Sequence, residues 1–274
     1  MLSKLPGRVA VDEGIVFGRG GERDLRCDVF TPPDQRRDRP SVLLIHGGGW
    51  YQGDRGQLRG YGIQLARHGF LCVTCEYRLT GEARWPAQIH DVKAALRFMR
   101  ANATALGIDP ERISVSGNSA GAHLSLMLAA TPNVPTFEGK GGHEGAGTAC
   151  AASVAIYAPT LLRVGQAGDP IALLLGAKAS RELEDAASPI TYAHRNFPPT
   201  LLVHGNADTV VPVDASFSMY QALSGTGAEV ELHVYDGAPH AFDAAPELGR
   251  QVTDLIALFL DRKVADPRPI AIPA

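Results

Sequence analysis

The pentapeptide Gly-Asn-Ser-Ala-Gly at residues 117–121 constrains the fold of this chain more than any other segment. Residues 113–116 alternate between apolar and polar side chains, which predicts a short strand, and residues 120–130 predict a buried helix. A serine on so sharp a turn takes a strained backbone conformation, which only small neighbouring residues tolerate. The turn would hold the hydroxyl of Ser119 above the carboxyl edge of a sheet, at a helix N-terminus that favours negative charge. This context indicates that Ser119 is a nucleophile.

A second glycine-rich segment lies upstream of the serine. Residues 41–45 predict a buried strand that runs directly into His46 and the tetrapeptide Gly-Gly-Gly-Trp at residues 47–50. Consecutive glycines turn sharply and leave backbone N–H groups pointing at a ligand, as an oxyanion hole requires. The alternative is a flexible loop without a role, but loops of this kind are known partners of the serine turn. We therefore expect an oxyanion hole here, with His46 holding the shape of the loop.

Two further predicted strands end next to residues that would complete a catalytic triad. Residues 200–204 predict a strand that is followed by a loop carrying Asp208. Residues 230–235 predict the last strand, and the loop after it carries His240. The order Ser119, Asp208, His240 along the chain is the order that α/β-hydrolases use. Ser119 would attack a carbonyl carbon, His240 would accept and return its proton, and Asp208 would orient the imidazole.

Other residues compete for the roles of base and acid. His204 lies at a strand end but before the acid, and the remaining histidines downstream of the glycine loop lack a position after the last strand: His68, His90, His123, His143, His194 and His233. Asp214 is the nearest alternative acid, but it is better placed to cap the helix predicted over residues 216–223. Asp243, close to the proposed base, is a further candidate. The position directly after a strand favours Asp208 over both.

Together these motifs resemble the hormone-sensitive-lipase-like esterases of the α/β-hydrolase fold. Within that group the chain is most similar to small bacterial esterase-like proteins known for hydrolysis of feruloyl and acetyl-xylan esters. The matching segments run through most of the chain: residues 46–50, 53–54, 76–79, 85–86 with 91, 117–121, 138–142, 188–190, 204–208, 211–212 and 237–242. The resemblance implies that the backbone N–H groups of Gly48, Gly49 and Ala120 form the oxyanion hole. The chain departs from many relatives at Ala122 and Ala241, where they have glycine, and this bears on pocket shape rather than on mechanism.

The alternation of strands and helices predicts a single α/β domain over residues 1–274. With the resemblance, we expect an α/β-hydrolase fold: a mostly parallel eight-stranded sheet with helices on both faces, an antiparallel N-terminal hairpin and no large cap domain. The expected hairpin strands and main helices span residues 9–17 and 24–30, and 57–68, 85–105 and 248–262. Residues 132–148 and 159–198 break the alternation and predict small, lid-like excursions that build the pocket.

Aromatic side chains beside the site are candidates for binding an ester group. Trp50 and Tyr51 adjoin the expected oxyanion loop, and Tyr157 ends the strand that follows the serine helix. All three are predicted to contact substrate, since a ring can stack on a sugar or on a phenolic acyl group. Arg78 and Asp91, in contrast, predict a structural ion pair rather than a substrate clamp.

Composition argues against several other classes of protein. The formal net charge of −3 predicts no basic surface for nucleic acid. The chain has too few cysteines for a disulfide framework: Cys27, Cys72, Cys75 and Cys150. Cys72 and Cys75 are three apart on a predicted strand and point to opposite faces, so buried free thiols are expected. No run of residues has the length of a membrane span or of a secretory signal, which predicts no membrane partner and a cytoplasmic location. The sequence leaves a homodimer open.

The sequence therefore predicts a serine carboxylic-ester hydrolase that acts through an acyl-enzyme without metal or cofactor. Its expected partner is a small-molecule ester of short-chain or aryl type, such as an acetyl or feruloyl ester. One alternative is an amide hydrolase of arylformamidase type, although those relatives resemble His-Gly-Gly-Tyr-Trp more than the segment at residues 46–50. Another is a non-catalytic ligand-binding protein on the same fold, but such proteins usually lack a member of the triad.

Overall fold

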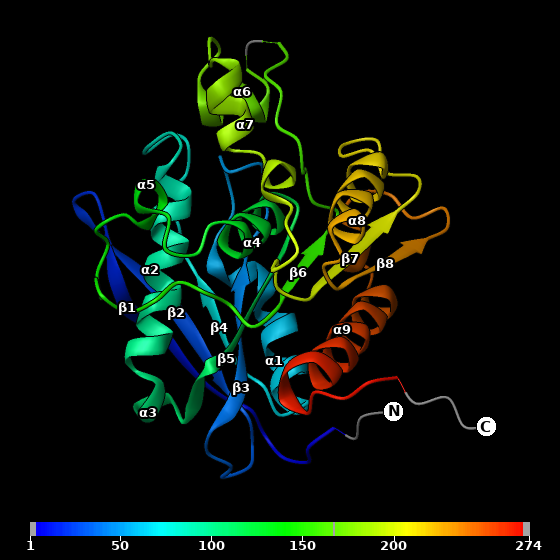
Figure 1. Ribbon diagram of the computed structural model, residues 1–274. Helices are drawn as coiled ribbons and strands as arrows, with labels where there is room; N and C mark the ends of the chain where they lie inside the picture. The colour runs from blue at the N-terminus through cyan, green and yellow to red at the C-terminus, as the bar shows by residue number, and fades with distance from the viewer. Residues whose placement is uncertain (1–3, 167, 271–274) are drawn as a thin grey trace.

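An eight-stranded, mostly parallel sheet forms the centre of the protein (Figure 1). The computed structural model describes residues 4–166 and 168–270. The strand order is β1-β2-β4-β3-β5-β6-β7-β8, with antiparallel pairing from β1 to β4 and parallel pairing from β4 to β8. The predicted fold class and N-terminal hairpin are thereby confirmed. The strands are β1 (Ala10–Gly20), β2 (Arg23–Thr31), β3 (Arg39–Ile45), β4 (Leu71–Cys75), β5 (Ile108–Asn118), β6 (Ser153–Ile156), β7 (Thr200–Gly205) and β8 (Val230–Tyr235).

Helices cover both faces of this sheet. Val42 and Leu44 of β3 pack with α1 and α9 on one face, whereas Leu43 and Ile45 pack with α2 and α4 on the other. A sheet buried on both faces needs such continuous apolar strands. The main helices are α1 (Arg59–Arg67), α2 (Ala87–Ala101), α4 (Ala120–Ala130), α8 (Asp214–Thr226) and α9 (Pro246–Leu260). Within the described residues, no helix is long and apolar enough to cross a membrane.

The helix predicted over residues 85–105 is interrupted near its end. α2 stops before Asn102, and the short α3 (Ala103–Leu106) starts after it. The backbone of Asn102 has a ψ of 18°, outside the helical range, and its side-chain amide donates to the carbonyl oxygen of Phe98 at 2.9 Å. The backbone N–H of Asn102 donates to the same carbonyl oxygen at 3.0 Å, so both hydrogen bonds of Asn102 close the last turn of α2.

Of the two excursions from the strand–helix alternation, only the second reaches the pocket. Residues 132–148, which include α5 (Pro135–Glu138), pack over α2 and the hairpin, so the prediction that they build the pocket is wrong. The N–H of Arg19 in β1 donates to the carbonyl oxygen of Gly141 at 2.8 Å, which ties this excursion to the hairpin. Residues 159–198 carry α6 (Pro170–Leu175), α7 (Arg181–Ala186) and the turn η2 (Pro189–Tyr192), and this excursion does reach the pocket.

A buried ionic cluster fixes the first excursion on α2. Nζ of Lys93 lies 2.7 Å from Oε1 of Glu138, and Nη1 of Arg97 lies 3.2 Å from Oε2. The side chains of Lys93 and Arg97 are 0% and 2% exposed. Burial lowers the pKa of Lys93, while the Glu138 carboxylate stabilises its charged form. Two buried cations therefore depend on one carboxylate.

Glu138→Gln is expected to lower the free energy of unfolding by about 3 kcal/mol, because both buried cations lose their counter-charge. Urea unfolding at pH 7 measures this loss. Glu13→Gln is the matched control, since Glu13 pairs with Arg59 at the surface, where the two side chains are 56% and 46% exposed. The control should cost less than about 1 kcal/mol. Equal losses in the two variants would contradict the importance of the buried cluster.

Candidate active site

Ser119 lies between β5 and α4 at the carboxyl edge of the sheet. Its backbone has φ +52° and ψ −119°, which is strained for any residue with a side chain. Two glycines make the turn sterically feasible. A Cβ at Gly121 would lie 2.0 Å from the carbonyl oxygen of Ile45, and a Cβ at Gly117 would lie 2.4 Å from the backbone of Gly121. The serine is thus raised on the sharp turn that the sequence predicts.

The structure brings Ser119, His240 and Asp208 into one hydrogen-bonded chain. Nε2 of His240 lies 3.0 Å from Oγ of Ser119, and Nδ1 of His240 lies 2.6 Å from Oδ2 of Asp208. The backbone N–H groups of Val210 and Val211 donate to Oδ1 of Asp208 at 2.8 and 2.9 Å. Burial opposes ionisation of the Asp208 carboxyl, but these hydrogen bonds outweigh it and hold its pKa below the usual value. A carboxylate that stays ionised can orient the imidazole and stabilise its protonated form.

In the described part of the chain, the hydrogen-bond partner of Nδ1 of His240 is Asp208 and neither alternative acid. The Asp243 carboxylate accepts the hydroxyl of Tyr157 at 2.5 Å and that of Tyr61 at 2.7 Å. Asp214 is the first residue of α8, and Val213 occupies the capping position, so the predicted cap is wrong. The negative charge of Asp214 still favours the first turn of the helix, and the residue lines the pocket.

The glycine loop after β3 adopts conformations that glycine takes most readily. Gly48 and Gly49 have φ of +107° and +59°. A Cβ at Gly48 would lie 2.1 Å from the carbonyl oxygen of Gln52, so a larger residue does not fit there. Gly49 and Ala120 line the pocket together with the serine. Ala120 is also the first residue of α4, whose N-terminus carries partial positive charge.

The segment after β4 braces this glycine loop. His46 stacks on the ring of Tyr77 with 4.3 Å between the ring centroids, and the Tyr77 hydroxyl donates to the carbonyl oxygen of His46 at 3.0 Å. The N–H of Thr80 donates to the carbonyl oxygen of Trp50 at 2.9 Å. Burial lowers the pKa of His46, which favours a neutral ring near pH 7. His46 therefore contributes packing and hydrogen bonds to the loop.

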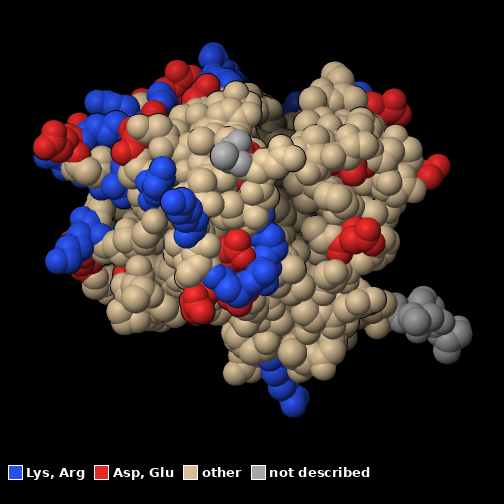
Figure 2. Space-filling model, turned by 90° about the horizontal axis from the view of Figure 1, so that it is seen from above, with Lys and Arg blue, Asp and Glu red and all other residues tan. Residues whose placement is uncertain are grey.

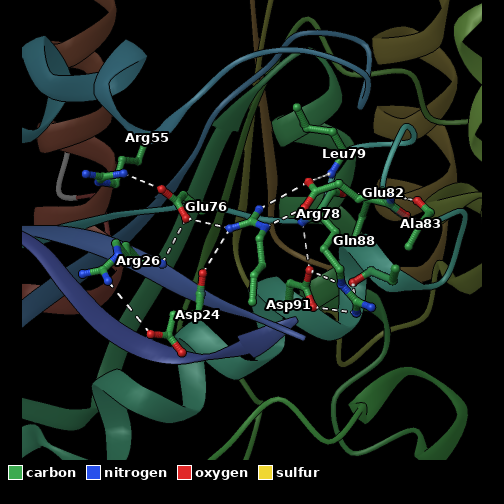
Figure 3. Close-up of polar contacts among 12 residues, drawn as sticks. Asp24, Arg26, Arg55, Glu76, Arg78, Leu79, Glu82, Ala83, Gln88 and Asp91 are labelled. Carbon is green, nitrogen blue, oxygen red and sulfur yellow. Dashed lines mark hydrogen bonds and ion pairs between the residues drawn. The ribbon is translucent and has the colours of Figure 1, made fainter. Parts of the chain in front are cut away.

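Ion pairs in turn hold this bracing segment (Figure 3). Arg78 donates to the carboxylate of Asp91 in α2 through two hydrogen bonds of 2.7 and 2.8 Å. Glu76 accepts a hydrogen bond from Arg55, and another from the N–H of Arg26 at 3.1 Å. The predicted structural ion pair between Arg78 and Asp91 is confirmed.

An apolar pocket of about 650 Å³ opens at Ser119. Its walls come from the glycine loop, from the second excursion and from the start of α8. Leu161 and Val210, which line the pocket, are 47% and 68% exposed. Figure 2 shows that charged side chains gather over the hairpin and α2 and are fewer over α8. The remaining apolar lining residues include Pro159, Pro170, Ile171, Ile190, Val211, Pro212 and Ala215.

The three aromatic residues predicted to contact substrate lie in different places. Trp50 lines the pocket. Tyr51 is 44% exposed and its ring packs close to Gly49. Tyr157 is 1% exposed and its ring lies 4.6 Å from that of His240, so the prediction that it lines the pocket is wrong. Its hydroxyl donates a hydrogen bond to Asp243, and its ring packs against the imidazole of His240.

Sequence patterns do not identify the individual residues of the pocket wall. Leu161 and Ile190 lie in the excursion that was predicted to build the pocket, but no pattern singles them out within it, and Val210 lies in the loop after β7, for which no pocket role was predicted. They meet because the second excursion folds back over the carboxyl ends of β6 and β7.

The residue after His240 has a left-handed backbone. Ala241 has φ +57° and ψ 29°, a region that costs an L-residue roughly 1 kcal/mol or more. The departure of this chain from relatives with glycine at the position therefore carries backbone strain, and it removes no functional group.

A known protein family, curated relatives and solved structures match this chain. The BD-FAE family model matches residues 27–223, which is more than half of the chain. The chain belongs to the BD-FAE family. The matched range contains the glycine loop, the serine turn and Asp208, and His240 lies beyond it. The predicted resemblance to α/β-hydrolase esterases is confirmed.

Two of the curated relatives of this chain come from Mycobacterium tuberculosis. Esterase LipQ is 33% identical over 276 residues, which cover 94% of this chain and 65% of LipQ. The probable carboxylic ester hydrolase LipM is 34% identical over 249 residues, which cover 85% of this chain and 57% of LipM. The chain thus spans between 57% and 65% of the length of these relatives.

Two solved structures of esterases match over almost their whole length. A truncated carbohydrate esterase from gut microbiota is 26% identical with a TM-score of 0.82, covering 92% of this chain and 97% of its own. Esterase Est2 of Thermogutta terrifontis, with propionate bound, is 27% identical with a TM-score of 0.78, covering 95% and 97%. These neighbours share the sheet and helix arrangement described above.

Proposed function

We propose that this chain is a serine carboxylic-ester hydrolase that acts on short-chain or aryl esters. The observation that carries the proposal is the hydrogen-bonded chain from Asp208 through His240 to Ser119, which ends in an apolar pocket. Relatives named as esterases or ester hydrolases support the same chemistry.

In the first half-reaction, Oγ of Ser119 attacks the ester carbonyl carbon while Nε2 of His240 accepts its proton. Asp208 holds Nδ1–H of the histidine and stabilises the imidazolium that forms. The backbone N–H groups of Gly48, Gly49 and Ala120 are proposed to donate to the developing oxyanion. His240 then returns the proton to the departing alcohol, which leaves an acyl group on Ser119.

The second half-reaction repeats these steps with water. His240 removes a proton from the water as it attacks the acyl-enzyme, and the tetrahedral intermediate collapses to release the acid and restore the Ser119 hydroxyl. Each proton that leaves a nucleophile is returned to a leaving group, so the cycle needs no further reactant.

The pocket supports esters with an uncharged apolar group. A volume of about 650 Å³ exceeds what an acetyl group fills and suits an aryl or medium-sized group. Est2 of Thermogutta terrifontis is described with propionate and with butyrate bound, which supports short acyl chains for the same fold. We therefore propose acetyl to butyryl esters and aryl esters of feruloyl type as substrates.

The test is steady-state hydrolysis of p-nitrophenyl acetate, butyrate and decanoate and of methyl ferulate, each beside an amide of the same acyl group. We expect kcat/KM to be highest on acetate, butyrate or ferulate and at least tenfold lower on decanoate, in keeping with the short acyl groups bound to Est2 of Thermogutta terrifontis. Faster turnover of the amides would instead favour an amide hydrolase. Binding of the esters without turnover would favour a ligand-binding protein.

A further inference from the structure

His204 is a buried histidine beside the proposed acid. It lies near the end of β7 and is 0% exposed, and both of its ring nitrogens have partners. Nδ1 lies 2.7 Å from the hydroxyl of Ser216 in α8. Nε2 lies 2.9 Å from the carbonyl oxygen of Val211 and 3.3 Å from Oδ2 of Asp208. The ring therefore connects β7, the loop that carries Asp208, and α8.

The partners determine the tautomer of this imidazole. A carbonyl oxygen only accepts hydrogen bonds, so Nε2 of His204 must carry the proton that points to Val211. Burial lowers the pKa of His204, so the ring is neutral near pH 7 and Nδ1 is an acceptor. The hydroxyl of Ser216 is then the donor. Hydrogen bonds run in one direction, from Ser216 to His204 and from His204 to Val211.

His204 helps to hold the loop after β7, from Asp208 to Val211, around the Asp208 carboxylate. The N–H of Val211 donates to Oδ1 of Asp208 at 2.9 Å, while the carbonyl group of the same residue accepts from His204. Oδ2 of Asp208 faces two imidazoles, that of His240 at 2.6 Å and that of His204 at 3.3 Å. Because the proton of His204 is directed at Val211, the short hydrogen bond at Oδ2 belongs to His240. Asp208 and His240 are the charged or titratable groups that act on the ring of His204.

We propose that His204 is a positioning residue, which holds the Asp208 carboxylate through Val211 in the orientation that pairs with His240. This inference rests on the proposed function of the triad. Without the donor at Nε2, the carbonyl group of Val211 loses its partner and the loop relaxes. The contact between Asp208 and His240 then lengthens, which weakens the stabilisation of the imidazolium. The expected consequences are a lower kcat and an acidic limb of the kcat/KM profile that moves to lower pH.

Two neutral substitutions separate this role from simple packing. In His204→Gln the side-chain amide nitrogen reaches the place of the ring Nε2 and can still donate to Val211. In His204→Asn the amide lies near the place of Nδ1, beside Ser216, and leaves Val211 without a donor. The two variants have the same charge and the same functional group. They differ mainly in which ring nitrogen of His204, Nε2 or Nδ1, their amide group replaces.

With p-nitrophenyl butyrate and active sites counted by titration, His204→Asn should lose roughly tenfold to a hundredfold in kcat with KM changed less than about twofold. Its acidic limb should move to lower pH, and His204→Gln should restore most of both. Ser216→Ala, which removes the partner of Nδ1, should show a smaller loss in the same direction and serves if His204→Asn does not fold. Equal kcat and pH profiles for the Asn and Gln variants would overturn the proposal.

A readout that needs no ester turnover separates failure of this inference from failure of the proposed function. The proton between His240 and Asp208 should give a downfield imidazole resonance in the proton NMR spectrum of the wild type, which should weaken or move upfield in His204→Asn and persist in His204→Gln. An unchanged resonance in the Asn variant would overturn the positioning role. Absence of Ser119-dependent hydrolysis in the wild type would instead contradict the esterase proposal.

Discussion

Ser119→Ala is expected to lower kcat for ester hydrolysis by roughly 10⁴- to 10⁶-fold while KM changes little. The reason is that the methyl group of alanine removes the attacking oxygen and leaves the pocket intact. His240 Nε2, which lies 3.0 Å from the serine oxygen, would then have no nucleophile to deprotonate. Hydrolysis of p-nitrophenyl butyrate with a purified variant, free of wild-type enzyme, measures the loss.

A covalent probe makes this result independent of the choice of ester. Paraoxon, a diethyl p-nitrophenyl phosphate, is such a probe, because an activated serine attacks its phosphorus. In the corresponding reaction, Oγ of Ser119 would displace p-nitrophenolate from phosphorus. Mass spectrometry should find one diethylphosphoryl group on the wild type and none on Ser119→Ala. Labelling of the variant to the same extent would show that another residue is the nucleophile.

Asp208→Asn is expected to lower kcat by roughly 10⁴-fold without unfolding the protein. An asparagine amide in place of Oδ2 would donate to Nδ1 of His240 and so favour the tautomer with the proton on Nε2. That nitrogen, protonated, cannot accept the proton of Ser119. The wild-type carboxyl has a lowered pKa and is ionised near neutral pH, so it accepts the hydrogen bond from Nδ1–H that the asparagine amide cannot accept.

Asp214→Asn is the control for this exchange. Asp214 lies on the first turn of α8 at the wall of the pocket, so its substitution should change kcat by less than about tenfold and act mainly on KM. Circular dichroism should show the same thermal transition for both variants within a few degrees. A larger loss in Asp214→Asn than in Asp208→Asn would move the acid to the start of α8.

Local patterns in the chain were sufficient to predict the elements that carry the candidate site. The serine turn depends on steric contacts within a few residues, such as those that exclude a Cβ at Gly117 and Gly121. Apolar strands and amphipathic helices have periods that are visible along the chain, which is why the sheet could be predicted. Ser119, Asp208 and His240 each follow a predicted strand, and parallel strands end at one edge of the sheet, so the three side chains were expected to meet there. Their order along the chain matches the order that α/β-hydrolases use.

The tertiary structure decided what lies around those elements. Residues 132–148 pack on α2 because Glu138 meets two cations that lie on that helix, and no local pattern predicts such a pairing. Tyr157 is at the predicted strand end, but its ring turns under His240, where Asp243 binds its hydroxyl.

The same distinction between local patterns and long-range contacts applies to the pocket and to the surroundings of Asp208. The sequence by itself predicted the α/β alternation and the serine turn, because these depend on strand and helix periodicity and on short-range sterics. The resemblance to α/β-hydrolase esterases added the sheet topology and the expected order of the candidate triad. The pocket wall and the place of His204 between Ser216 and Val211 depend on contacts between segments that only folding brings together. Such contacts leave no periodic trace in the chain, because each joins loops and helix ends of unrelated local structure.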